Sequence, residues 1–204
     1  MGDRNSIRRA YDEIAETYAA ERSDGGREME ILDEFLAPLS DGPRVLDAGC
    51  GQGTPVLRRV DAAATGIGID FSRRQLGLAA ANVPGAPLLQ ADVTQLPLAD
   101  DGIDAIVAFH TLIHVPTEDQ RAAITEFSRI LRPGGRLLLS EGPAAWAGTN
   151  PDWLDSGVEM QWHIDGVDAT RTQLSDAGFE IGDEWEVDED GDEHWVFLAA
   201  QLDG

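Results

Sequence analysis

The spacing of apolar positions along the chain changes twice, and these changes predict its elements. Near the start, apolar residues recur every three or four positions, which predicts an amphipathic helix over 6–22 and a second helix over 28–39. Short, almost uninterrupted apolar runs follow, with helical spacing between them. Such runs are typical of strands that are buried on both faces of a parallel sheet. The strands are expected over 44–48, 66–70, 87–90, 103–109 and 135–141.

Polar residues at the borders of these runs mark where helices are expected to begin. Ser72 is expected to cap a helix over 73–81, and Thr117 a helix over 118–131. In the last third, a helix over 168–177 precedes two strands that flank an acidic, glycine-containing turn. These strands are expected over 179–187 and 193–201, with the turn over 188–192. An antiparallel hairpin therefore ends an otherwise parallel, alternating α/β pattern.

Three glycines follow the first expected strand in the sequence Val45-Leu-Asp-Ala-Gly-Cys-Gly-Gln-Gly-Thr54. Glycine accepts a positive φ and lets a ligand approach the main chain closely. A strand, a turn containing Gly49, Gly51 and Gly53, and then a helix indicate a βα unit that binds a nucleotide.

The spacing of these glycines bears on which nucleotide is bound. The dinucleotide fingerprint is G-x-G-x-x-G, whereas this turn has G-x-G-x-G. Asp47 precedes the turn, where it would repel a diphosphate and attract an ammonium group. A cationic or zwitterionic nucleoside is therefore favoured over NAD, with an NAD(P)-linked oxidoreductase as a rival interpretation. Asp70 ends the second expected strand, close to the roughly 20-residue offset at which an acid meets ribose hydroxyls.

These motifs resemble those of the class I S-adenosylmethionine-dependent methyltransferases, in the group that includes ubiquinone- and menaquinone-biosynthesis-like enzymes. The resemblance implies one methyltransferase domain over residues 1–204, with a Rossmann-like, doubly wound, mostly parallel seven-stranded sheet and a C-terminal antiparallel hairpin. It also implies that residues 1–40 form an N-terminal helical cap. Five segments carry it in the expected order: 45–53, 68–72, 89–97, 103–110 and 131–139.

The resemblance further implies S-adenosylmethionine as the cofactor and assigns residues to it. The turn would pass beneath the methionine part, Asp70 would accept both ribose hydroxyls, and Asp92 would accept the adenine amine beside the Val93 backbone N–H. Phe109 and His110 would lie near the sulfonium. The candidate cofactor-binding residues are Tyr18, Asp47, Gly49, Gly51, Gly53, Asp70, Phe71, Asp92, Val93, Phe109 and His110.

Some of these residues also have purely structural interpretations. Tyr18 fits a core-facing aromatic of the first helix as well as a ligand. Asp92 fits the N-cap of a short helix. Cys50 fits a small residue of the turn better than a nucleophile.

A base is needed only if the methyl acceptor arrives protonated, and histidine can serve near neutral pH. His110 and His163 are the candidate catalytic residues. His110 and His114 are four positions apart, which also raises metal binding, but no third ligand follows at a metal-site spacing. No metal is therefore expected.

Residues 142–166 contain three tryptophans and read as an irregular segment. Because ligands enter such folds at the carboxyl ends of the strands, this segment is a candidate acceptor wall, with coverage of the sheet as the alternative. The predicted function is methyl transfer to an O, N or C atom of a small-molecule acceptor. The alternative is a non-catalytic module or sensor that binds S-adenosylmethionine or S-adenosylhomocysteine.

The charge of the chain is extreme. Its net charge is −23, from 38 acidic and 15 basic residues, and every basic residue is arginine. This charge causes strong self-repulsion, which salt would screen, and the composition resembles that of proteins from salt-accumulating halophiles. The acidic run over 183–193 fits a solvated surface coat. Such a field disfavours nucleic acid as a partner.

A single cysteine and the lack of an apolar run of about 18 residues predict a cytoplasmic protein without a membrane segment. The sequence leaves the oligomeric state open.

Overall fold

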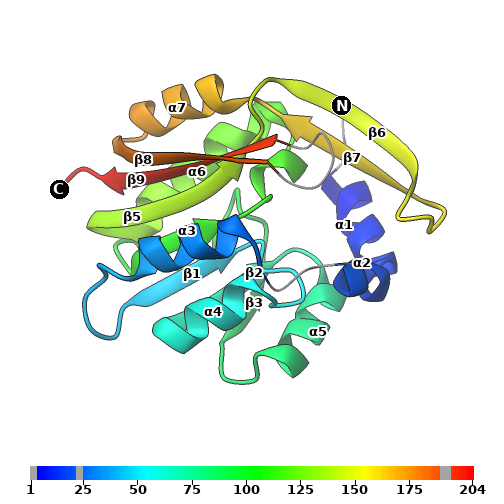
Figure 1. The fold of residues 1–204 in the computed structure, drawn as a ribbon, viewed down its shortest axis with the longest axis horizontal. Coiled ribbons are helices and arrows are strands. Elements are labelled where there is room, and N and C mark those ends of the chain that lie inside the picture. The colour runs from blue at the N-terminus through cyan, green and yellow to red at the C-terminus, as the bar shows by residue number, and fades with distance from the viewer. Residues whose placement is uncertain (1–3, 22–24, 189–193) are drawn as a thin grey trace.

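Seven strands form one sheet in the computed structural model, which describes residues 4–21, 25–188 and 194–204 (Figure 1). The strand order is β3-β2-β1-β4-β5-β9-β8. Neighbours from β3 to β5 pair in parallel, whereas β9 pairs antiparallel with both β5 and β8. The predicted mostly parallel sheet with a C-terminal antiparallel hairpin is therefore confirmed. The strands are β1 (Arg44–Ala48), β2 (Thr65–Asp70), β3 (Leu88–Gln90), β4 (Ile103–Ala108), β5 (Leu131–Glu141), β8 (Phe179–Asp188) and β9 (His194–Leu202).

Helices cover both faces of this sheet, as expected for a doubly wound fold. One face packs against α3 (Arg27–Leu36), α4 (Val56–Ala63) and α5 (Arg73–Asn82). The other face packs against α6 (Thr117–Ile130) and α7 (Val167–Asp176). The first helices, α1 (Arg4–Glu13) and α2 (Ala15–Glu21), lie beyond the sheet beside α5, where α1 also packs against a separate strand pair (Figure 1).

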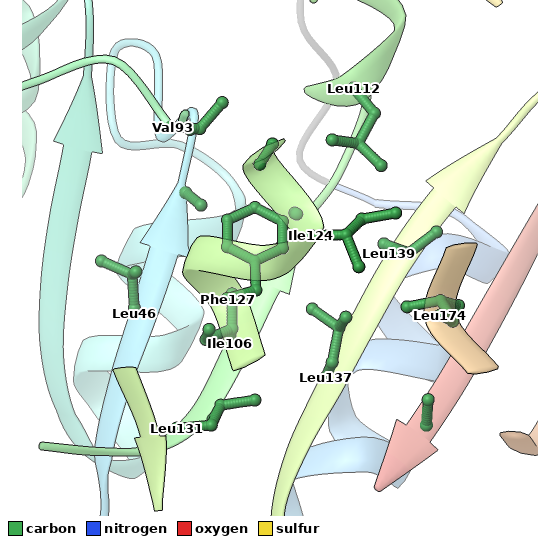
Figure 2. Close-up of a cluster of buried hydrophobic side chains, with 14 of the residues drawn as sticks. Leu46, Val93, Ile106, Leu112, Ile124, Phe127, Leu131, Leu137, Leu139 and Leu174 are labelled. Atoms are coloured by element: carbon green, nitrogen blue, oxygen red, sulfur yellow. The ribbon is translucent and has the colours of Figure 1, made fainter. Parts of the chain in front are cut away.

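Alternate residues of the central strands supply the two cores. On β1, Val45 belongs to the core beneath α3 and α4, whereas Leu46 belongs to the core beneath α6. Ile124 and Phe127 of α6 point at the strands that carry Leu46 and Leu137 (Figure 2). Burial on both faces explains why these strands lack polar alternation in the sequence.

Several predicted boundaries are wrong. The helix expected over 6–22 is broken at Ile14 into α1 and α2. Thr117 is the first residue of α6 and does not cap it, because Pro116 occupies the N-cap position and no side chain caps the helix. The strand expected from residue 135 begins at Leu131, because Leu131 pairs with Ile103 and a register shift accommodates the Pro-Gly-Gly sequence within β5. Ser72 does cap α5, since its Oγ accepts a hydrogen bond from Gln75 N over 3.1 Å.

The segment over 142–166 is not irregular. It forms an antiparallel pair, β6 (Trp146–Trp153) with β7 (Val158–Ile164). A register shift between Asn150 and Trp153 accommodates Pro151 within β6. The predicted hairpin turn over 188–192 falls mostly on residues 189–193, which lie outside the described residues.

A buried carboxyl group links β5 to α7. Glu141 ends β5, where its Oε1 accepts a hydrogen bond from Gly142 N over 2.8 Å and its Oε2 accepts one from Thr170 Oγ1 over 3.0 Å. Its exposed fraction is 0%. Burial raises the pKa of Glu141 from 4.5 to about 7, because the charged form is poorly solvated there.

This raised pKa predicts a stability effect. The folded protein binds the proton of Glu141 more tightly than the unfolded chain, so the contribution of Glu141 to stability falls as pH rises from about 4.5 to about 7. We expect Glu141→Gln to reduce this loss of stability with rising pH. Above pH 7 the substitution should raise the free energy of unfolding by roughly 1–3 kcal/mol. Thermal melts in concentrated KCl at acidic and alkaline pH measure the difference in stability between wild type and variant. Glu180→Gln, on the exposed surface of β8, is the charge-matched control. Identical pH dependence in wild type and Glu141→Gln would contradict the prediction.

Candidate functional site

A cavity opens at the carboxyl ends of β1, β2 and β4, where the strand order reverses direction. Open α/β sheets bind ligands at this position. Side chains of α1, α2, α5 and the 3₁₀ helix η1 (Leu112–His114) complete its wall. Gly53 and His163 are not among the described residues that line it. The predicted site residues that line it are Tyr18, Asp47, Gly49, Gly51, Asp70, Phe71, Asp92, Val93, Phe109 and His110.

The glycine turn needs glycine for two different reasons. Gly49 has φ +80°, and a Cβ atom there would lie 2.4 Å from Thr111 Oγ1, so the turn and Thr111 pack too closely for a side chain. Gly51 has φ +52°, and a Cβ atom there would meet nothing nearer than Gln75 Oε1 at 3.9 Å. At Gly51 the requirement is therefore conformational, and its backbone faces the cavity. Gly53 instead packs against Ala79 of α5.

Asp70 fixes the position of this turn. Its Oδ2 accepts a hydrogen bond from Gly51 N over 2.9 Å, and its Oδ1 accepts one from Ser72 N over 2.7 Å. Burial raises the pKa of Asp70 from 3.8 to about 6, although the bonds from Ser72 and Gly51 lower it. The carboxyl group therefore lies in a poorly solvated position where hydroxyl donors of a ligand would favour its charged form.

Asp92, on the loop after β3, is held by two kinds of contact. Its Oδ1 accepts hydrogen bonds from Thr94 N over 2.9 Å and from Thr94 Oγ1 over 2.7 Å. Its Oδ2 accepts one from the guanidinium of Arg4 on α1 over 2.9 Å. The bond to the backbone two residues on closes a turn, and no helix follows, so the N-cap interpretation of Asp92 is wrong. Arg4 lines the cavity, and nothing in the sequence pointed to it.

The inner cavity wall carries negative charge. Asp47 and Asp70 are both nearly fully buried, with exposed fractions of 2% and 7%. Cys50 lies between them in the sequence, and burial together with these two carboxylates raises the pKa of its thiol well above 9. The thiol therefore stays protonated near neutral pH, which supports the interpretation of Cys50 as a small turn residue. Such a wall suits a ligand with a positive group.

Gln75 of α5 is a site residue that the sequence did not reveal. It is buried, lines the cavity, and neither its Nε2 nor its Oε1 has a hydrogen-bond partner within the described structure. The sequence around it, Ser72-Arg-Arg-Gln75, looks like a capping box, in which Gln75 would bond back to the helix start. Because its amide does not do so, a buried polar group remains for a polar ligand to satisfy.

A tyrosine and a histidine from distant parts of the chain meet at the outer end of the cavity. Tyr11 of α1 donates its hydroxyl hydrogen to Nε2 of His114 over 2.7 Å, and Nδ1 of His114 donates to the Gln161 carbonyl over 3.3 Å. Burial lowers the pKa of His114 from 6.5 to about 4, so the ring is neutral at physiological pH. With both nitrogens engaged, His114 is poorly placed to ligate a metal together with His110.

His110 is held in an unusual backbone conformation at the end of β4. It has φ +50°, which is uncommon outside glycine, and its N–H donates to Ser140 Oγ over 2.7 Å. Its ring packs edge-on against Trp195, with centroids 4.6 Å apart. Its Nε2 lies 3.5 Å from Oε2 of the buried Glu28, on α3. Residues held in strained conformations by several contacts cluster at functional sites.

His163 is not among the described residues that line the cavity. It is on β7, and its carbonyl accepts a hydrogen bond from Gln120 over 2.6 Å. Its Nε2 is buried and has no hydrogen-bond partner among the residues that the structure describes. Within the described ranges, no group of three or more His, Cys, Asp or Glu side chains is arranged to hold a metal ion. In the same part of the chain, no helix combines the length and apolarity that a membrane span requires.

Comparison with known proteins identifies the family. A family model described as a methyltransferase domain matches residues 46–139. Methyltransferase GfsG of Streptomyces halstedii is 42% identical over 57% of this chain and 44% of its own length. An uncharacterized methyltransferase of Synechocystis, sll0829, is 30% identical over 77% of this chain and 76% of its own length. The chain belongs to the class I S-adenosylmethionine-dependent methyltransferases.

A solved structure extends the likeness of this methyltransferase to the whole fold. Magnesium protoporphyrin IX methyltransferase (ChlM) of Synechocystis, with bound S-adenosylmethionine, has a TM-score of 0.75 over 99% of this chain and 98% of that chain, at 22% identity. S-adenosylmethionine is the cofactor of the family. The residues present fit it, since the cavity offers buried carboxylates for its positive groups and the unpartnered amide of Gln75 for a polar group.

The match is uneven along the methyltransferase. The family model begins at residue 46 and ends at residue 139, so α1 and α3 precede it and the β6–β7 pair follows it. The chain also spans less than half the length of GfsG. The family model therefore covers the glycine turn, Asp70, Asp92 and His110, but none of the helices and strands just named.

Proposed function

We propose that this methyltransferase transfers a methyl group from S-adenosylmethionine to an O, N or C atom of a small-molecule acceptor. One observation carries the proposal: a single cavity joins the glycine turn and its buried carboxylates to His110 at the end of the neighbouring strand. When bound, S-adenosylmethionine supplies a methyl group on a positively charged sulfur that leaves as a neutral thioether. The protein then has to orient the acceptor, exclude water and remove a proton where the acceptor carries one.

The inner cavity residues are suited to hold the cofactor. Asp70 would accept the ribose hydroxyls, because its carboxylate is fixed beside the Gly51 backbone. Asp92 would accept the adenine amine beside Val93, in exchange for its contact with Arg4. Asp47 would face the ammonium group of the methionine part, where a buried carboxylate is otherwise poorly solvated.

His110 is the proposed base for acceptors that arrive protonated. It lines the cavity at the end of β4, next to Phe109, whose ring packs edge-on against Phe197 with centroids 4.9 Å apart. An O–H or N–H proton of the acceptor would pass to this imidazole as the new bond to the methyl carbon forms. His163 does not line the cavity, and we therefore retain His110 alone as the proposed base.

The outer end of the cavity supports an apolar or aromatic acceptor. Tyr11 and Tyr18 line it, and the ring of Tyr11 packs edge-on against Trp153 of β6 with centroids 5.7 Å apart. Trp153 in turn packs edge-on against Trp162 of β7, with centroids 5.5 Å apart. The β6–β7 pair thus backs this wall with aromatic side chains, as the acceptor-side hypothesis for 142–166 requires.

Calorimetry and a transfer assay test the proposal. We expect S-adenosylhomocysteine to bind and NAD not to bind, and we expect labelled methyl to appear on at least one member of a panel of phenols, quinols and amines. Tight binding of S-adenosylhomocysteine without transfer to any acceptor would instead favour a non-catalytic sensor. Binding of NAD alone would overturn the assignment of the cavity.

The charge of the chain bears on the setting of this reaction. We propose a salt-rich cytoplasm, a small-molecule rather than a nucleic-acid acceptor, and the ubiquinone- and menaquinone-biosynthesis-like group within the family. A net charge of −23 without any lysine supports the salt-rich cytoplasm, because salt screens the self-repulsion. The same charge supports a small-molecule acceptor over nucleic acid, because an acidic surface repels phosphate. The motif pattern supports the third.

The salt proposal gives a measurable prediction. Because surface repulsion is screened within about 3 Å at 1 M salt, raising KCl from about 0.1 M to 2 M should raise the melting temperature by roughly 5–15 °C. Differential scanning calorimetry measures this shift, and sucrose at matched osmolality controls for solute exclusion. An equal rise of the melting temperature in sucrose would show that charge screening is not the cause.

A further inference from the structure

We infer that Glu28 is the positioning residue for His110, and that it fixes which ring nitrogen accepts the proton of the methyl acceptor. This inference rests on the proposed function, because it assigns a role within the same cavity. Glu28 lies in the first turn of α3, more than 80 positions before His110 in the sequence. Its side chain is buried against the histidine, with exposed fractions of 10% for Glu28 and 14% for His110.

The contact between the two side chains selects a tautomer. Glu28 Oε2 lies 3.5 Å from His110 Nε2. A carboxylate can only accept a hydrogen bond, so it favours the tautomer in which Nε2 carries the hydrogen. The unprotonated nitrogen is then Nδ1, and it is the atom available to a ligand in the cavity that His110 lines. Contacts of this kind are often long before substrate binds and shorten in the complex.

Two further contacts hold the ring in place. Ser140 Oγ accepts the His110 N–H and maintains the positive φ, while Trp195 packs edge-on against the imidazole. The ring therefore has Glu28 beside one nitrogen and an aromatic ring nearly perpendicular to its own plane. A ring that is restrained in this way can keep one nitrogen directed toward the acceptor.

The proton balance explains why a carboxylate is needed. An oxygen or nitrogen lone pair of the acceptor would form the new bond to the methyl carbon, while the carbon–sulfur bond would break and leave its electron pair on the departing neutral thioether. The electron pair of the acceptor O–H or N–H bond would stay on the acceptor atom, and its proton would move to Nδ1. The imidazole then carries a positive charge, and Glu28 is the buried anion placed to stabilise it. The proton leaves to solvent after the methylated product has departed.

The tautomer can be measured without knowing the acceptor. In wild-type protein, long-range ¹H–¹⁵N correlation spectra should show His110 with a protonated Nε2 and an unprotonated Nδ1. The spectrum of His110→Asn assigns the signal among the four histidines. Glu28→Leu, which removes the carboxylate, should give a mixture of tautomers. A protonated Nδ1 in wild type would overturn the inference, and this result does not require Glu28→Leu to fold.

Kinetics supply the second readout. With an acceptor found in the transfer assay, Glu28→Gln should lower kcat by about 10- to 100-fold with little change in KM or in the affinity for S-adenosylhomocysteine. Glu30→Gln is the matched control, because Glu30 lies on the same helix but is exposed and pairs with Arg27. Wild-type kcat in Glu28→Gln would overturn the positioning role. Wild-type kcat in His110→Ala would instead overturn the proposed base, so the two failures are distinguishable.

Discussion

Replacing Asp70 by alanine is expected to weaken the binding of S-adenosylhomocysteine by about 100-fold or more. The carboxylate is buried, orders the glycine turn through Gly51, and is placed to accept the ribose hydroxyls. Each hydrogen bond to a charged acceptor contributes about 1.5–3 kcal/mol, so the loss of two corresponds to at least two orders of magnitude in Kd. Isothermal titration calorimetry on wild type and variant measures the difference.

The same residue should make binding depend on pH. Burial raises the pKa of Asp70 to about 6 in the free protein, whereas hydroxyl donors favour its charged form. Affinity should therefore fall as pH drops below about 6 and become constant above it, and Asp70→Asn should lose this dependence. Glu141→Gln removes a buried carboxylate outside the cavity and should bind like wild type. A folded Asp70→Ala protein with wild-type affinity would overturn the assignment of the cavity.

Replacing His110 by alanine is expected to lower kcat by about 100- to 10,000-fold with a hydroxyl acceptor, the range that a positioned general base contributes. The side chain lines the cavity, and its backbone is held by Ser140, so the loss should concern proton transfer rather than folding. Affinity for S-adenosylhomocysteine should be largely retained. Steady-state kinetics with the best acceptor of the panel, together with calorimetry, separate the two effects.

His163→Ala is the control for this experiment. Both histidines are candidates from the sequence, but His163 is on β7 and does not line the cavity in the described structure. Its removal should leave kcat within a few-fold of wild type. Loss of turnover in His163→Ala with normal turnover in His110→Ala would reverse the assignment.

The parallel core of the fold could be predicted because its strands are buried on both faces. Val45 and Leu46 pack into different cores, and such strands appear in the sequence as continuous apolar runs that end at a glycine turn. The β6–β7 pair could not be predicted in this way. Its β6 strand is largely exposed and contains a proline, so neither alternation nor an apolar run marks it.

The candidate site likewise contains residues that the sequence predicts and residues that it does not. Asp70 and the glycine turn follow from local spacing, because both sit at the ends of strands that are adjacent in the sheet. Glu28 and Tyr11 lie on helices that precede the sheet, and only tertiary packing brings Glu28 to His110 and Tyr11 to His114. Gln75 could not be recognised as a site residue, because the capping-box pattern from Ser72 to Gln75 gives a structural reason for a glutamine at this position, although its amide does not make that bond.

Helix α1 is fastened to the rim of the cavity at three separate points. Arg4 bonds to Asp92, Tyr11 bonds to His114, and Asp12 accepts a hydrogen bond from Ser72 Oγ over 2.7 Å. We expect that a molecule as large as a nucleoside enters and leaves the cavity only when these contacts of α1 loosen. The residence time of the spent cofactor is then set by how often α1 detaches, and departure rather than chemistry would limit the turnover of a good acceptor.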